Sequence, residues 1–157
     1  MEIILKGDAQ IKSVPSLKDK ALRINLNNNI YGTFAEIGAG QETVRHFFRA
    51  GGASGTIAKA MSAYDKSFSD AIYGIENDRR YVTEDRLRKM LSHEVRLIED
   101  RISRDDNPNR MFFSYANTVT TIDFAKRYKG HGWVGIRYQI DPEEPYNCLL
   151  YTSPSPR

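Results

Sequence analysis

Two glycine-rich turns are the part of this sequence best suited to bind a ligand. One is Gly38-Ala39-Gly40, and the other runs from Gly51 to Gly55. Each precedes a segment whose apolar spacing is helical, and a helix N-terminus approached through glycines presents unpaired amides to a phosphate or carboxylate. The alternative is that these glycines form ordinary helix caps and turns. The expected ligand-binding residues are Gly38, Gly40, Gly51, Gly52, Ser54, Gly55, Thr56 and Lys59.

Three residues could take part in proton transfer. Glu42 and His46 are spaced i, i+4, so they would share a helix face, where a plain surface ion pair is the alternative. No third ligand accompanies them, so no metal site is predicted. His131 lies between two glycines, and a histidine on an exposed turn can titrate near physiological pH. These are the candidate catalytic residues, with an ordinary polar turn residue as the alternative for His131.

The elements around the glycine turns follow from the spacing of apolar residues. Leu22, Ile24 and Leu26 alternate with polar residues, which predicts a strand, and residues 30–37 predict a second strand that pairs antiparallel with it. Residues 41–50 have the spacing of a short helix. Beyond Gly55, the apolar residues at 57, 60, 61, 64 and 68 predict another helix.

The rest of the chain contains the clearest helix. Residues 84–103 carry an apolar stripe at helical spacing, with Thr83 as the expected N-cap. Residues 111–122 and 133–140 are rich in aromatic and β-branched types and predict strands. The fold class is therefore predicted to be mixed α/β (α+β), with a mixed sheet packed with about three helices. We expect one incomplete domain over residues 21–147, after a loosely attached lead-in over residues 1–20.

Composition and charge exclude several classes of protein. The chain has 157 residues, the length of one ordinary domain, and 40% of them are hydrophobic. The net charge of +3 comes from basic residues interleaved with acids, which argues against a nucleic-acid-binding face. The longest apolar run is four residues, too short to cross a membrane. With a single cysteine and no signal peptide, the expected location is the cytoplasm.

Residues 148–157 differ in character from everything before them. They read Cys-Leu-Leu-Tyr-Thr-Ser-Pro-Ser-Pro-Arg, an apolar patch followed by alternating serine and proline. All ten match the conceptual translation of a transposase mosaic-end adapter used in DNA library preparation. A natural disordered tail is the alternative, since two prolines would stop any regular element. We expect this segment to be a non-native tail.

Across residues 20–147 the chain resembles the amino-terminal part of a larger family of bacterial cytoplasmic proteins. Segments 21–26, 30–65, 112–125 and 129–133 carry the resemblance. Members are labelled as nicotinate-nucleotide adenylyltransferases or as TonB-dependent receptors. The receptor label conflicts with the missing signal peptide and barrel strands. The adenylyltransferase label implies two histidines that contact ATP phosphates, and Gly130-His131 supplies one of them.

The glycine turns and the resemblance together imply a function. We expect a cytoplasmic enzyme, or part of one, that binds a nucleotide or phosphorylated ligand, with nucleotidyl transfer as the implied reaction and ATP with Mg²⁺ as the implied cofactor. One alternative is a non-catalytic binding or assembly module that oligomerises through its Tyr- and Phe-rich strands. A third is a methyltransferase-like domain, because residues 34–40 resemble the first motif of S-adenosylmethionine-dependent methyltransferases, although the further glycine of that motif is missing. No nucleic-acid or membrane partner is expected.

Overall fold

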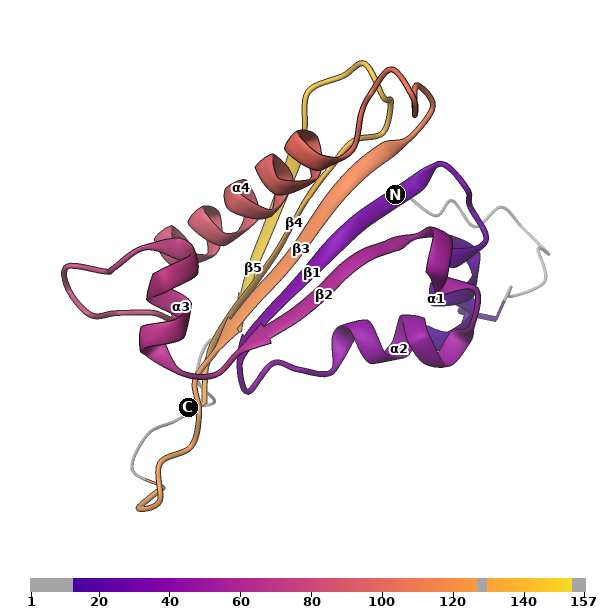
Figure 1. Ribbon diagram of the computed structural model, residues 1–157. Helices are drawn as coiled ribbons and strands as arrows, with labels where there is room; N and C mark the ends of the chain where they lie inside the picture. Colours follow the sequence, from indigo (N-terminus) through magenta and orange to yellow (C-terminus); the bar gives the residue numbers. More distant parts are fainter. Residues whose placement is uncertain (1–12, 127–129, 154–157) are drawn as a thin grey trace, which may run out of the picture.

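A five-stranded sheet in the order β2-β1-β3-β4-β5 forms the centre of the computed structural model, which describes residues 13–126 and 130–153 (Figure 1). β1 pairs in parallel with β2 and β3, and β4 is antiparallel to both β3 and β5. The predicted mixed α/β fold with a mixed sheet is therefore confirmed. The strands are β1 (Ile30–Gly38), β2 (Ile57–Ala63), β3 (Met111–Val119), β4 (Gly132–Tyr138) and β5 (Asn147–Ser153).

Among the described residues, each face of the sheet carries two α-helices. α3 (Lys66–Tyr73) and α4 (Glu84–Arg101) lie on one face, while α1 (Leu17–Asn25) and α2 (Thr43–Ala50) lie on the other (Figure 1). The described residues thus contain four α-helices, where about three were predicted. α4 agrees with the predicted helix 84–103, and the Thr83 hydroxyl accepts the Arg86 amide at 3.1 Å as its N-cap.

The main hydrophobic core lies between the sheet and α4. Small residues on the strands let this helix approach closely: a Cβ added to Gly135 would lie 2.9 Å from the Leu91 side chain. Short and long apolar side chains therefore interlock across this layer. The buried members of the core cluster are Ala35, Ile37, Ala63, Tyr73, Leu87, Met90, Leu91 and Ala116.

The prediction of a strand over Leu22 to Leu26 is wrong, because this segment belongs to α1. Ser16 and Asp19 form a capping box, in which the Ser16 hydroxyl accepts the Asp19 amide at 3.1 Å. Three alternating apolar residues are compatible with a helix as well as with a strand, and the capping box stabilises the helix here. Consequently β1 has no antiparallel partner before it. α1 begins within the expected lead-in, whose residues 1–12 lie outside the described range.

The helix predicted from Ile57 is also wrong, because residues 57–63 form β2. Its even-numbered residues are exposed, and the odd-numbered ones are half-buried or buried. Parallel pairing with β1 from Gly32 to Ile37 holds the segment extended despite its three alanines, which are poor strand formers. The helical residues that follow form α3, where the Asp65 carboxylate accepts the Phe68 amide at 3.0 Å as N-cap.

Residues 147–153 form β5 at the edge of the sheet, paired with β4. This segment includes most of the expected non-native tail, whose last four residues lie outside the described range. Its origin in an adapter sequence stays a prediction.

Within residues 13–126 and 130–153, no helix combines the length and the apolar character needed to cross a membrane.

Candidate ligand-binding site

A cavity of about 460 Å³ lies where the parallel strands end. β1 and β3 run in register to Gly38 and Val119, and β2 runs parallel to β1 as far as Ala63. All three therefore present their carboxyl ends at one edge of the sheet, where open α/β sheets bind their ligands. We call this cavity the carboxyl-end pocket; residues 37–38, 64–66, 69, 79, 81–82, 118–121 and 131 line it. None of them belongs to β5.

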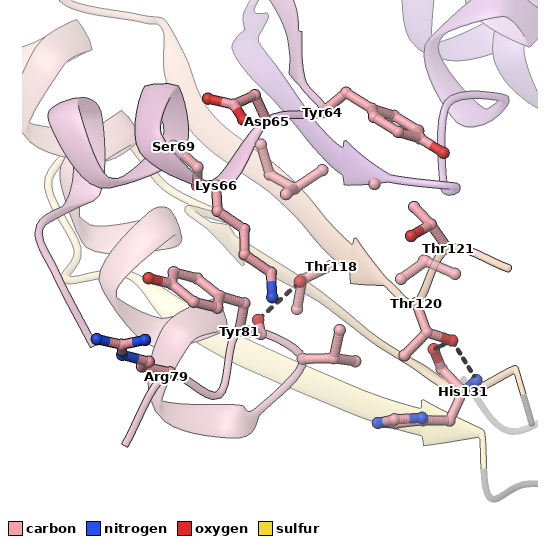
Figure 2. A pocket seen from close by; sticks show the side chains of 14 residues that line it. Tyr64, Asp65, Lys66, Ser69, Arg79, Tyr81, Thr118, Thr120, Thr121 and His131 are labelled. Carbon is pink, nitrogen blue, oxygen red and sulfur yellow. Dashed lines mark hydrogen bonds between the residues drawn. The ribbon is translucent and has the colours of Figure 1, made fainter. Parts of the chain in front are cut away.

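Two basic side chains line the pocket. Lys66 begins α3 and extends towards Tyr81, with its ammonium 5.5 Å from the centre of the tyrosine ring (Figure 2). Arg79 lies in the loop between α3 and α4. Within the described parts of the chain, neither side chain forms a salt bridge. The pocket therefore has two positive charges that no acidic side chain neutralises at contact distance.

The backbone at Arg79 has an unusual conformation. Its φ angle is 56°, in the left-handed region that non-glycine residues rarely adopt, at a cost of about 1–3 kcal/mol. A turn holds it there, since the Arg79 amide donates to the Glu76 carbonyl at 3.0 Å and the Arg80 amide to the Asp78 carboxylate at 3.0 Å. Such strained residues are concentrated at functional sites. This conformation is consistent with a binding role for Arg79.

Arg86 of α4 fixes the loop that carries Arg79. Its side chain is 1% exposed, and its guanidinium donates to the Gly74 carbonyl at 2.6 Å, to the Ser69 hydroxyl at 2.8 Å and to the Glu76 carboxylate at 3.1 Å. Its centre also lies 5.0 Å from the Tyr81 ring. One buried cation thus ties α3, α4 and the intervening loop together, and holds the pocket wall in place.

Tyr81 connects its loop to α3 and to the end of β3. Its hydroxyl donates to Asp70 at 2.8 Å, and this hydrogen bond raises the pKa of Tyr81 above its ordinary value, which keeps the hydroxyl protonated. Its carbonyl accepts the Thr118 hydroxyl at 2.8 Å, which connects the loop to the end of β3. The residue is therefore held at both its backbone and its side chain.

The opposite wall carries His131 and Thr120 (Figure 2). The His131 amide donates to the Thr120 hydroxyl at 2.9 Å, and the Thr120 amide donates to the His131 carbonyl at 3.0 Å. The backbone of His131 is thereby fixed while its side chain stays exposed. Of the three candidate catalytic residues, His131 lines the pocket.

The other two, Glu42 and His46, lie elsewhere. They belong to the start of α2 and its first turns, on the opposite face of the sheet from α3 and α4 (Figure 1). Glu42 is exposed, and no hydrogen bond or salt bridge in the described residues joins it to His46. The structure therefore does not unite the three candidates in one site.

The first glycine turn reaches the pocket but has its polar groups engaged. Gly38 has a φ of +74°, and a Cβ on it would lie 2.1 Å from the Val119 carbonyl, so only glycine fits. That carbonyl accepts the Ala39 amide at 3.3 Å. The Gly40 carbonyl accepts the Asn117 side-chain amide at 2.7 Å. Gly38 lines the pocket, whereas Gly40 does not.

A buried carboxylate occupies the N-terminus of α2. Glu36, 2% exposed, accepts the Thr43 amide at 2.9 Å and the Asn117 side-chain amide at 3.0 Å, and its other oxygen lies 3.5 Å from the Val44 amide. Negative charge at a helix N-terminus is favourable. The helix amides that were expected to bind an external anion thus donate to the protein's own Glu36 side chain.

The second glycine turn lies at the opposite end of the strands. The turn contains one short 3-10 helix, Ala53–Gly55, and leads into the strand β2, so the helix N-terminus expected after it does not exist. The Gly51 carbonyl accepts the Asn25 side-chain amide at 2.9 Å, and the buried Thr56 hydroxyl donates to the Asn25 carbonyl at 3.0 Å. The turn docks α1 on the sheet. It contains the expected binding residues Gly51, Gly52, Ser54, Gly55 and Thr56.

Lys59, the remaining expected binding residue, is engaged in an internal ion pair. Its ammonium lies 2.6 Å from a carboxylate oxygen of Glu94, which is fully buried in α4. The other oxygen of Glu94 accepts the Tyr73 hydroxyl at 2.8 Å, and burial together with the Glu94 charge raises the pKa of Tyr73. The charge of Lys59 therefore compensates a buried acid at a distance from the carboxyl-end pocket.

Local sequence patterns do not indicate four residues of the pocket, namely Tyr64, Lys66, Arg79 and Tyr81. Had residues 57–63 been assigned to a parallel strand, the residues directly after them would have been placed at the carboxyl edge of the sheet. Tyr64, Asp65 and Lys66 were thus accessible to sequence reasoning. Arg79 and Tyr81 depend on the Arg86 contacts, which no local pattern indicates.

A second cavity, of about 480 Å³, lies on the other face of the sheet beside α1 and α2. We call it the apolar groove. Phe34 and Phe47 pack against each other at its edge with ring centres 5.1 Å apart. Its lining is almost entirely hydrophobic and includes Ile24, Phe113, Tyr115, Ile136, Tyr138 and Ile140, of which Ile140 is 66% exposed.

Known proteins share this fold at low sequence identity. The competence/damage inducible protein CihA from Agrobacterium tumefaciens has a TM-score of 0.60 and 12% identity, over 90% of this chain and 83% of that one. A competence damage-inducible protein A (ComA) from Klebsiella pneumoniae has a TM-score of 0.56 and 10% identity, over 87% and 79% of the two chains. A competence-damaged protein (CinA) superfamily protein from Escherichia coli has a TM-score of 0.54 and 12% identity, over 90% and 80%. At these identities the similarity shows the fold alone. No protein-family model and no curated protein sequence matches the chain.

Proposed function

We propose that this chain binds a phosphorylated small molecule, with a nucleotide as the ligand class, in the carboxyl-end pocket. One observation carries the proposal: Lys66 and Arg79 line this pocket, and neither has a salt-bridge partner among the described residues. Lysine and arginine are the usual protein ligands of phosphate. The negative charge of the ligand would pair with these two cations.

The rest of the pocket is consistent with a nucleotide. Its volume of about 460 Å³ lies within the ordinary range for small-molecule sites. Tyr64 lines the pocket and is 67% exposed, so its ring is available to stack on a base. Thr121 adds a hydroxyl for the sugar or phosphate. His131 adds an imidazole to the pocket wall. The adenylyl transfer that the resemblance implies requires a magnesium-bound triphosphate and is not part of this proposal.

A calorimetric titration of the whole chain with AMP and with orthophosphate tests the proposal. Replacing Lys66 by Gln is expected to weaken AMP binding by about tenfold, because one charge-assisted hydrogen bond is lost. Lys20→Gln is the matched control, since Lys20 is exposed on α1, on the other face of the sheet, and should leave the affinity within about twofold of wild type. Equal effects of the two variants, or no binding by either ligand, contradict the proposal.

The apolar groove favours a second candidate function, that of an assembly module. Exposed apolar surface of this kind is typical of protein interfaces. If this function holds, the chain should oligomerise with rising concentration, and Ile140→Glu should abolish the oligomer, because a charge would be buried in the interface without a partner. Multi-angle light scattering measures the mass directly. A monomer at the highest soluble concentration of the wild type argues against this candidate.

A further inference from the structure

The carboxyl-end pocket offers little to a magnesium-nucleotide complex. Mg²⁺ is held in such sites by one or two carboxylates together with phosphate oxygens and water. Asp65 is the one carboxylate among the described residues that line the pocket, and its Oδ2 already accepts the Phe68 amide as the N-cap of α3. The implied ATP with Mg²⁺ therefore fits these residues poorly.

The positive charge comes instead from the protein. Lys66 extends into the pocket, and Arg79 lies on the other side of the Tyr81 ring, on a loop that Arg86 fixes from the core (Figure 2). Cationic side chains of this kind can neutralise a phosphate as a divalent metal would. A phosphate already neutralised by a metal ion would be attracted to them less strongly.

We propose that the pocket binds its ligand as a free phosphomonoester, without a divalent cation, and that Lys66 and Arg79 supply the charge that Mg²⁺ supplies elsewhere. This inference rests on the proposed function and narrows its ligand class. Nucleoside monophosphates are then the preferred ligands, and magnesium-complexed triphosphates are disfavoured.

Calorimetric titrations with AMP and ATP, each in EDTA and in excess MgCl₂, test the inference. The AMP affinity is expected to agree within about twofold between the two buffers, and the ATP affinity to fall at least about threefold in MgCl₂. Tighter binding of either nucleotide in MgCl₂ overturns the inference and leaves the proposed function standing. If neither nucleotide binds in either buffer, the proposed function and the inference both fail.

Asp65→Asn provides an independent test in the same pocket. Asparagine is as good an N-cap as aspartate, so the variant keeps α3 and removes one negative charge. AMP binding is expected to tighten by about two- to fivefold, because a like charge near the phosphate is gone. If the variant instead weakens ATP binding in MgCl₂ but not in EDTA, Asp65 is a metal ligand and the inference is wrong. Far-ultraviolet circular dichroism confirms that the variant is folded.

Discussion

Replacing Arg86 by Met is expected to lower the free energy of unfolding by about 3–5 kcal/mol, the usual consequence of removing one partner of a buried ion pair. Its guanidinium is 1% exposed and donates to the Ser69 hydroxyl, the Gly74 carbonyl and the Glu76 carboxylate. Methionine can fill much of the same space but donates nothing. The buried acceptors would lose their donor, and the loop that carries Arg79 would lose its anchor.

Arg88→Met is the matched control for this variant. Arg88 lies two residues further along α4, half its side chain is exposed, and its ion pair with Glu84 is on the surface. Its replacement is expected to change stability by about 0.5 kcal/mol or less. Urea denaturation followed by circular dichroism measures both variants. Similar transition midpoints for the two would show that Arg86 does not hold the pocket wall.

The second large effect is expected at Glu36. Its replacement by Leu, a residue of similar size, is expected to cost about 2–4 kcal/mol, because the Thr43 amide and the Asn117 side-chain amide lose their acceptor. Both donors lie in the buried region between β1, β3 and the start of α2. The lost free energy of unfolding measures the hydrogen bonds rather than the formation of a cavity, because leucine and glutamate have similar volumes.

Glu42→Leu makes the same chemical change six residues later. Glu42 is exposed at the N-cap position of α2 and forms no side-chain capping hydrogen bond. Its replacement is expected to change stability by about 0.5 kcal/mol or less. Thermal unfolding by calorimetry compares the two variants. If Glu42→Leu proves as harmful as Glu36→Leu, the stability of α2 does not depend on the buried carboxylate.

Local sequence patterns predicted several helices and strands correctly. The predicted α4 and its Thr83 cap are present, as are β1, α2, β3 and β4, with ends shifted by at most a few residues. In α4 the apolar stripe and the observed burial coincide. Periodicity is informative where an element is long and one of its faces is buried.

The element that positions the site could not be predicted in this way. β2 is short and alanine-rich, and its apolar residues at 57, 60 and 61 satisfy helical spacing by coincidence. Its extended form depends on pairing with β1, a contact between segments more than 20 residues apart. Because of the misassigned strand, five expected binding residues were placed at a helix N-terminus that does not exist, at the other end of the parallel strands from the carboxyl-end pocket.

The first glycine turn illustrates a different limit. Gly38-Ala39-Gly40 does follow a strand and precede a helix, as the sequence analysis predicted. The pattern could not indicate that the Glu36 carboxylate, two residues earlier, accepts a helix amide. The same carboxylate also accepts the side-chain amide of Asn117, which lies 81 residues away in the chain. An internal carboxylate and an external phosphate satisfy the same donors, so the pattern is equally compatible with both.

An amide ¹⁵N–¹H NMR titration of the whole chain with AMP shows where the ligand binds. Concentration-dependent shifts are expected at the carboxyl-end pocket, at Lys66, Arg79, Tyr81, Thr120 and His131. No shifts are expected at Gly51 to Thr56, at the other end of the parallel strands. Shifts confined to that second turn, or to the apolar groove, would mean that the nucleotide does not bind in the carboxyl-end pocket.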